Sequence, residues 1–448
     1  RLRFDFGTLH TIGRFRISCT QSSSPTLQGT LSIPQIAGLP AAKRTPQQAK
    51  LLRDHFLRTA GPAETKALHT KIVSLRAQQK KLNSAGSTSM IMADMPNRRK
   101  TYILHRGQYD QRREEVFAGA PIALGAMSKD APRNRLGLAR WLVNGQHPLT
   151  ARVTVNREWQ RLFGEGLVKS TEEFGTQGDW PSHPALLDWL AVQFTKNGWD
   201  QKALLKLIVT SATYRQDSRA SAELLAHDRD NRLLARGPRH RLDAEVIRDN
   251  ALAVSGLLVD QIGGPSVFPY HPKGLWLELN NRPGYSRSYQ QGKGDDLHRR
   301  SLYTYWKRTV PPPSMATFDA PEREFCLIRR SRTNTPLQAF VMLHDPQFIE
   351  AARQLAGRMI TSGKSPQNRI THGFRIITAR KPSPRETQIL SQLYTKRLSY
   401  YQANPKAVDA LLAIGEAAKQ QSSSPAELAA WTTVARAMLN LSEAITKN

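Results

Sequence analysis

The sequence predicts a mainly α-helical protein with a small β-containing part at its N-terminal end and orthogonally packed helices in its C-terminal two-thirds. From about residue 132 onward, helix-like segments follow one another, and Pro and Gly stand near their starts and ends, as at Pro184 and Gly256. Residues 2–6 and 12–19 instead alternate apolar and polar side chains, which is typical of strands. A hydrophobic content of 39% and a charged content of 23% indicate a globular chain.

The first 130 residues are predicted to hold short and varied elements. Residues 1–20 are interpreted as the last strands of an upstream β-sandwich, and residues 21–130 as a linker, a helical hairpin and short strands. The hairpin begins at Thr45-Pro46, a cap followed by a first-turn proline, and its second helix covers about 63–82. The apolar stripe of that second helix is interpreted as core, with a groove for a partner as the alternative. The two short strands are expected at 90–95 and 101–105.

The remainder is predicted to form a helical domain at 131–330 and a C-terminal helical subdomain at 331–448. Within the first, residues 257–330 form a Gly-, Pro- and aromatic-rich insertion with one strand at 301–306. The expected helices cover 133–143, 150–163, 184–197, 201–210, 242–256, 335–361, 367–380, 382–402 and 425–446.

The net charge of +29 predicts an acidic partner. It is spread along the chain with an excess at the N-terminal end, where residues 1–120 carry 20 Lys and Arg against 7 Asp and Glu. An acidic protein, an anionic glycan and a nucleic acid all match this charge. Nucleic acid is disfavoured because the sequence has no zinc finger, no RNP-like strand and no long basic helix.

Several site classes find no support in the sequence. No apolar run approaches the roughly 20 residues of a membrane-spanning helix. Cys19 and Cys326 form neither a zinc motif nor a CxxCH haem motif, so no metal, haem or other cofactor is predicted in this chain. A disulfide between them stays open, and two free thiols are the favoured interpretation. There is no HExxH sequence and no phosphate-binding Gly loop.

From residue 134 on, a series of segments is specific enough to suggest a family. They include NRLGLARWLV (134–143), HPLTARVTVNREWQ (147–160), SHPALLDWL (182–190), IVTSATYRQ (208–216), RLDAEVIRD (241–249) and TNTPLQA (333–339). Over about 130–445 the chain resembles the C-terminal domain of unknown function of secreted, cytochrome-c-associated proteins of planctomycete-type bacteria, with a weaker likeness upstream. The resemblance implies an exported protein, periplasmic or extracellular, and a c-type haem in an associated cytochrome domain or partner. It implies no catalytic residues.

Two stretches of the helical domain carry candidate binding residues. Asn156 and Gln160 share one helical face and Arg157 adjoins it, so they could form a polar pocket wall or satisfy buried backbone carbonyls of neighbouring loops. Gln177 lies in a Gly-rich loop, and His183 stands before a helix start, where it could act as a ligand or an acid/base or serve a structural role.

A second group of candidates surrounds two later helix starts. Glu245 and Arg248 lie on one helical turn, where a buried ion-pair network is the alternative to a site. Arg329, Arg330 and Arg332, ahead of the Thr335-Pro336 helix start, form the best anion-site candidate, and Gln338 in that first turn is included with them. The alternative is that these arginines pair with Asp319 or Glu245.

The favoured hypothesis is an exported assembly or binding module of a cytochrome-linked system that docks an acidic protein or an anionic glycan. The first alternative is an enzyme acting on polysaccharide or another anionic substrate, with its site among His183, Glu245, Arg248, Arg329 and Arg332. The second is nucleic-acid binding through the basic surface. Aromatic residues of the insertion could stack on sugars or pack loops onto helices; these are His271, Trp276, Tyr285 and Tyr289.

Overall fold

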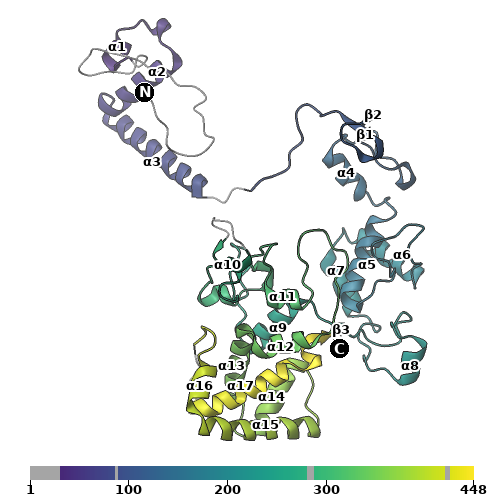
Figure 1. The fold of residues 1–448 in the computed structure, drawn as a ribbon. Coiled ribbons are helices and arrows are strands. Elements are labelled where there is room, and N and C mark those ends of the chain that lie inside the picture. The colour runs from purple at the N-terminus through teal and green to yellow at the C-terminus, as the bar shows by residue number, and fades with distance from the viewer. Residues whose placement is uncertain (1–30, 86–88, 280–286, 419–423, 448) are drawn as a thin grey trace. The chain divides into compact units, whose positions relative to one another are not determined.

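A computed structural model describes residues 31–85, 89–279, 287–418 and 424–447 (Figure 1). It divides the chain into two compact units, Arg1–Arg99 and Lys100–Asn448, which are described separately here. Eighteen α-helices and two small two-stranded sheets lie in the described residues, so the prediction of a mainly α protein with a small β part is confirmed. The strands predicted within residues 1–20, together with Cys19, lie outside the described residues. Cys326 is exposed and has no disulfide partner among the described residues.

The first unit contains α1 (Ile33–Ala37), α2 (Pro46–Thr59) and α3 (Ala63–Ala85). The Thr45 hydroxyl accepts from the Gln48 amide at the start of α2, as the cap-then-proline pattern predicts. The apolar stripe of α3 is exposed in the described residues and not core, because α3 runs well beyond α1 and α2 (Figure 1). Its members are Leu68, Ile72, Leu75 and Leu82.

The second unit begins with an antiparallel hairpin of β1 (Thr101–Leu104) and β2 (Arg112–Val116), in which Thr101 faces Val116. The strand expected at 101–105 is therefore confirmed. The strand expected at 90–95 is wrong: these residues have no regular secondary structure. A strand needs the backbone of another strand as partner, and alternation along one segment does not supply it.

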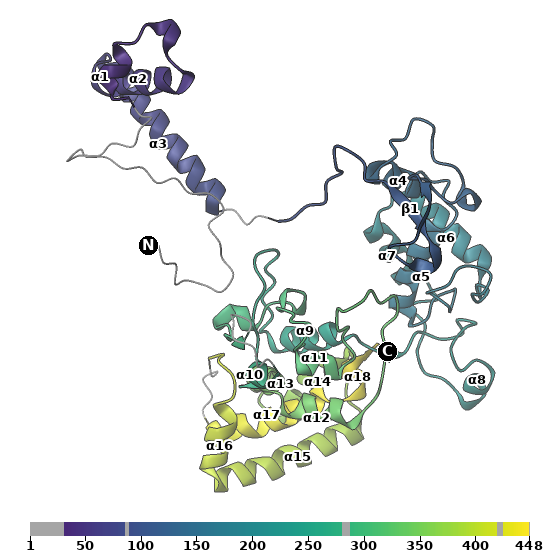
Figure 2. The same ribbon diagram turned by 45° about the horizontal axis from the view of Figure 1, so that its top comes forward.

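Three helices form the first core of this unit. In both views α5, α6 and α7 group together, and their buried apolar residues form one cluster that includes Val155, Trp159 and Leu187 (Figures 1 and 2). Asp200 caps α7 by accepting from two backbone amides. The helices of this region are α4 (Arg135–Leu142), α5 (Thr150–Phe163), α6 (Pro184–Lys196), α7 (Gln201–Val209) and α8 (Ala222–His227).

A second core lies among the later helices, where α13 packs on α17 and α17 packs on α15 (Figure 2). Trp431 of α17 is fully buried at its centre. The elements are α9 (Ala244–Ser255), α10 (Leu275–Leu279), α11 (Pro313–Thr317), α12 (Pro336–His344), α13 (Pro346–Thr361), α14 (Pro366–Thr378), α15 (Pro384–Ala403), α16 (Pro405–Leu412), α17 (Pro425–Leu439) and α18 (Ser442–Ile445).

Three predictions in this region are wrong. The helix expected over 425–446 ends at Leu439, because Leu441 has an extended backbone, and the short helix α18 follows it at Ser442–Ile445. The helix expected over 335–361 is broken at Asp345, which ends α12 and caps α13, because Pro346 has no N–H to continue the first helix. The strand expected at 301–306 is a 3₁₀ turn, Ser301–Tyr303, followed by a single parallel bridge between Thr304 and Val267.

The last described residues pair with a segment from the middle of the sequence. β3 (His240–Arg241) pairs antiparallel with β4 (Thr446–Lys447), so the last described residues lie beside the segment that leads into α9. This pairing fixes His240, which lines a cavity. None of the described helices combines the length and the apolar character that crossing a bilayer requires.

Candidate functional site

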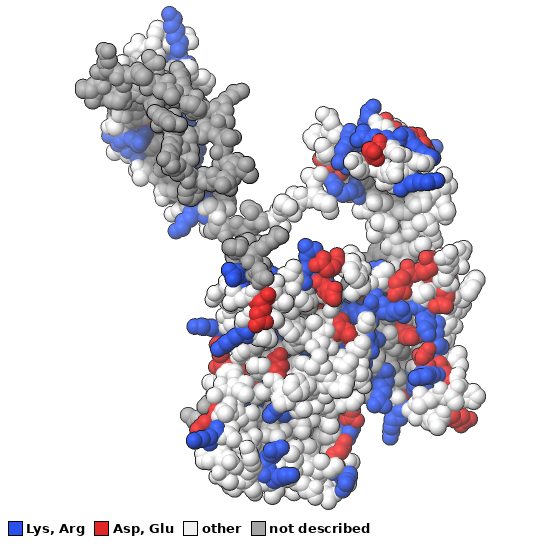
Figure 3. Space-filling model, in the orientation of Figure 1, with Lys and Arg blue, Asp and Glu red and all other residues white. Residues whose placement is uncertain are grey.

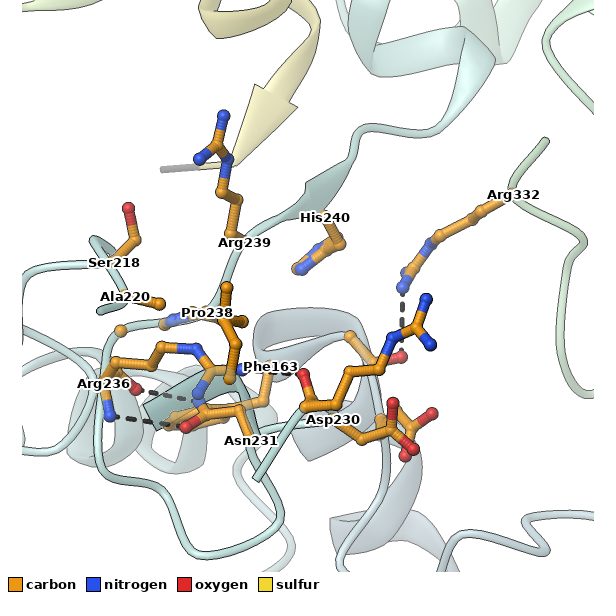
Figure 4. Close-up of a pocket in the computed structure, with 15 residues that line it drawn as sticks. Phe163, Ser218, Ala220, Asp230, Asn231, Arg236, Pro238, Arg239, His240 and Arg332 are labelled. Carbon is orange, nitrogen blue, oxygen red and sulfur yellow. Dashed lines mark hydrogen bonds between the residues drawn. The ribbon is translucent and has the colours of Figure 1, made fainter. Parts of the chain in front are cut away.

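A cavity of about 480 Å³ opens where the C-terminal end of α5 meets the loop that leads to β3. Figure 4 shows Arg239, His240 and Arg332 on one side of it and Arg236, Asn231 and Asp230 on the other. Its ionisable lining is mostly basic: the members are Glu165, Arg229, Asp230, Arg236, Arg239, His240 and Arg332.

Gly164, which ends α5 with φ of 91°, allows two of these side chains to approach the backbone. A Cβ at this position would lie 3.1 Å from His240 Nδ1 and 3.3 Å from Arg332 Nη1. The absence of a side chain lets Arg332 Nη1 donate to the Gly164 carbonyl at 3.0 Å. The end of α5 therefore anchors one cation of the cavity.

The opposite wall is held rigid by a buried arginine. Arg236 donates to the carbonyls of Asp228 at 2.9 Å and Arg229 at 2.7 Å. The Asp228 carboxylate accepts from the amides of Arg232 and Leu233, each at 2.7 Å. The hydrogen bonds of Arg236 therefore stabilise the loop, and the other lining arginines are the ones that could bind a ligand.

Three of the lining arginines have no carboxylate partner in the part of the chain that the structure describes. Among the described residues no carboxylate lies within ion-pair distance of Arg229, Arg239 or Arg332. The two carboxylates of the lining interact with other cations. Asp230 pairs with Lys169 at 3.0 Å, and Glu165 lies 3.9 Å from both Lys169 and Arg232. The hydrogen bond from Lys169 is the main reason that the pKa of Asp230 is lowered. The cavity therefore favours an anion.

His240 adds a neutral group to this basic wall. Burial, and then the charges of Arg332 and Lys447, lower the pKa of His240 to about 4, so the imidazole is uncharged at pH 7. One ring nitrogen hydrogen-bonds to the Arg161 backbone, and Nδ1 is buried without a hydrogen-bond partner in the described residues. A ligand that brings a hydroxyl next to its acidic group would satisfy this Nδ1.

The lowered pKa of His240 makes stability depend on pH. The histidine stabilises the fold above its unfolded pKa of about 6.5, and this contribution is lost as the pH falls toward 4. Between pH 7 and pH 5 the loss is about 2 kcal/mol. We expect His240→Gln to lack this pH-dependent contribution. The free energy of unfolding, measured by urea denaturation, should then fall by about 2 kcal/mol less between pH 7 and pH 5 in the variant than in wild type. His227→Gln, on exposed α8, is the control; an equal change in both variants would contradict the assignment.

Of the predicted site residues, only Arg332 lines this cavity. Asn156 is fully buried, and its amide pairs with both backbone groups of Val168, at 2.8 and 3.0 Å, which is the loop-satisfying alternative weighed above. Gln160 is buried on the same helix, whereas Arg157 is exposed. Gln177 is exposed on its loop.

His183 and Gln338 lie at helix starts. His183 is the residue before α6, and its Nδ1 lies 3.1 Å from the Ser182 hydroxyl. Gln338 forms a capping box with Thr335 at the start of α12 and also donates to the Thr317 carbonyl at 3.0 Å.

Of the three arginines ahead of α12, Arg330 is the one that pairs with Glu245. Glu245 accepts two hydrogen bonds from Arg330, at 2.6 and 3.2 Å, and Arg329 pairs with Glu172 at 3.3 Å. Asp319 is the partner of Arg241. Arg248 is buried among backbone carbonyls and Gln347.

No hydrogen bond or ion pair among the described residues joins any two members of the set proposed for an enzyme site. Each of the five has separate partners: His183, Glu245, Arg248, Arg329 and Arg332. In the same part of the chain no group of three His, Cys, Asp or Glu side chains is placed to hold a metal ion.

The aromatic residues of the insertion pack on one another. The His271 and Tyr289 rings lie 4.6 Å apart, and the Trp276 and Tyr289 rings 5.2 Å apart. Trp276 is 6% exposed, so it has no free face for a sugar. Tyr285 lies outside the described residues.

Sequence reasoning missed most of the basic cavity. Arg229 and Arg239 lie in the loop that leads to β3, and His240 begins β3, a strand of only two residues that is too short to show periodicity. The available signal was local composition, because five arginines fall between positions 229 and 241. Such a run is normally interpreted as a solvated turn.

Comparison with known families identifies the family of this chain. Residues 134–394, more than half of the chain, match the family model described as a protein of unknown function (DUF1553). This confirms the expected domain of unknown function, over a shorter range than the predicted 130–445. No curated protein and no solved structure matches.

Proposed function

Starting from the fact that this chain belongs to the DUF1553 family of proteins of unknown function, we propose that it is a binding module that docks an acidic group in the cavity beside His240 and Arg332. The acidic group is a carboxylate or sulfate of an anionic glycan or an acidic side chain of a protein partner. The observation that carries the proposal is the set of three cavity arginines without a carboxylate partner among the described residues.

The chemistry of the lining supports an anion in particular. A guanidinium offers several N–H donors in a fixed plane, which suits the paired oxygens of carboxylate and sulfate groups. Arg332 uses Nη1 on the Gly164 carbonyl, which orients the rest of its guanidinium. A volume of about 480 Å³ is large enough for one sugar ring or one acidic side chain.

The basic charge of the chain assists encounter with an acidic partner. Figure 3 shows Lys and Arg side chains scattered over the visible face of the second unit, with Asp and Glu side chains among them. Together with the net charge of +29, this attracts an acidic partner over long range at low salt. The cavity then supplies the specific contacts.

The setting of this binding is also part of the proposal. The resemblance to secreted, cytochrome-c-associated proteins supports an exported module of a cytochrome-linked system, with any c-type haem carried by an associated domain or partner. The haem absorbance and protein composition of the complex isolated from native cells would test this setting.

Arg239→Gln with Arg332→Gln should weaken binding of a hexagalacturonate probe by at least tenfold, because both substitutions remove donors and charge from the cavity. Isothermal titration calorimetry at low salt measures the affinity. The matched control is Arg215→Gln with Arg219→Gln, since both residues are exposed on the same connecting segment and neither lines the cavity.

The control removes the same net charge, so it separates the cavity from general electrostatics. Equal losses in the two double variants would refute the site. A short DNA duplex that binds as tightly as the probe and is weakened equally by both pairs would favour nonspecific nucleic-acid binding instead.

A further inference from the structure

A second cavity, of about 610 Å³, lies at the start of α6 and differs from the basic cavity in character. Its apolar wall includes Leu149, Phe174 and Leu187, and Trp180 stands at its edge. Its charged lining consists of Arg152, Asp179 and Asp188. Two carboxylates against one guanidinium give it a net negative charge, so it is unsuited to the acidic ligand of the proposed function.

Trp180 presents a large apolar surface to solvent. Its side chain is 90% exposed, although burying an indole is strongly favourable. An exposed aromatic ring beside an apolar cavity is typical of a binding surface.

The loop that carries Trp180 is held in place by several backbone contacts. The Asp179 amide donates to the Ser170 hydroxyl at 2.7 Å, and the Ser182 amide donates to the Leu167 carbonyl at 2.8 Å. A Cβ at Gly178 would collide with the Glu173 carbonyl, so glycine is required for this turn. Trp180 is therefore displayed on an ordered support, which reduces the entropy lost on binding.

The polar groups of the cavity are arranged to accept hydrogen bonds. Arg152 Nε donates to Asp188 Oδ1 at 2.6 Å, and this hydrogen bond lowers the pKa of Asp188. Arg152 Nη1 donates to the Pro148 carbonyl at 2.5 Å, which fixes the pair. The Asp179 carboxylate has no partner among the described residues, so it is free to accept from a ligand.

We propose that this cavity binds a neutral carbohydrate, with one pyranose ring stacked on Trp180 and its hydroxyls donating to Asp179 and Asp188. The C–H face of a pyranose packs on an indole, while its hydroxyls are both donors and acceptors. A proline-rich peptide would also pack on Trp180, but its prolines have no N–H to offer the carboxylates. The free acceptors of the cavity therefore favour the sugar.

Affinity electrophoresis of the whole chain, run toward the cathode, tests the proposal. The gels contain hydroxyethyl cellulose, galactomannan, xyloglucan or amylopectin. We expect at least one of these neutral polysaccharides to retard the protein. Trp180→Ala should weaken that interaction at least tenfold, and Asp179→Asn should weaken it severalfold.

Trp189→Ala is the matched control, because Trp189 is also exposed, at 49%, on α6 but does not line the cavity. It should change the affinity less than twofold, as should Arg239→Gln with Arg332→Gln. This last arm separates the carbohydrate site from the basic cavity. Retardation by none of the four polymers, or equal retardation of wild type and Trp180→Ala, would overturn the proposal. So would Trp180-dependent binding of a proline-rich peptide without retardation by any polymer.

Discussion

Replacing Arg248 with Met should lower the free energy of unfolding by about 3 kcal/mol or more. Arg248 is 2% exposed and lies on α9, from which it reaches into the segment before Ser301–Tyr303. Its guanidinium donates to the carbonyls of Leu297 at 2.7 Å and Arg299 at 2.9 Å and to Gln347 Oε1 at 2.7 Å. Methionine fills much of the space but donates no hydrogen bond, so buried carbonyls lose their partner.

Arg300→Met is the matched control for this substitution. Arg300 follows directly on the segment that Arg248 holds, but its side chain is 49% exposed and pairs with Asp260 at 3.0 Å. A surface ion pair contributes about 1 kcal/mol or less, so this variant should remain close to wild type. Urea denaturation followed by tryptophan fluorescence measures both. Losses of equal size would show that Arg248 is not the anchor of this segment.

The helices were predictable because their signals are local. Thr45 and Ser424 each precede a proline, and in the structure each hydroxyl accepts a backbone amide at a helix start. A capping hydrogen bond joins groups only three residues apart, so a short stretch of sequence is enough to predict it. Pro346 is likewise a local signal for a helix break. The sequence pattern was nevertheless interpreted as one longer helix over 335–361.

Strands and sites were harder because their partners are distant in sequence. Residues 301–306 alternate like a strand, yet Arg248 and Asp249 engage Ser301 from about 50 residues away and hold this segment in a turn. His240 is placed by β4, which lies about 200 residues further along the chain. Arg332 was found because it precedes a helix start, whereas the other cavity arginines depend on how the loop closes.

Replacing Glu350 with Gln should cost about 3 kcal/mol of unfolding free energy. Glu350 on α13 is fully buried and accepts from His298 Nε2 at 2.9 Å, from the Ala417 amide at 2.6 Å and from the Tyr270 hydroxyl at 3.2 Å. Arg353 lies 3.8 Å away and is 2% exposed. A neutral glutamine would leave this buried guanidinium without a carboxylate.

The pH dependence gives this prediction a second readout. Burial alone raises the pKa of Glu350, but the hydrogen bonds from His298, Ala417 and Tyr270 together bring it below its usual value. A carboxylate with a lowered pKa stabilises the fold above its unfolded pKa, about 4.5, and this contribution is lost as the pH falls further. The difference between wild type and Glu350→Gln should therefore be full at pH 7 and shrink below pH 4.5.

Glu416→Gln is the control, because Glu416 lies in the same loop as Ala417 but is exposed, with Gln291 as its partner at 3.0 Å. It should change stability by less than about 1 kcal/mol at both pH values. A Glu350→Gln variant as stable as this control at pH 7 would mean that the buried charge is not needed. Since a Cβ on Gly415 would lie 2.5 Å from Glu350 Oε1, the loop is closely fitted to this carboxylate. The buried charge and the loop that covers it are therefore expected to stabilise the fold together.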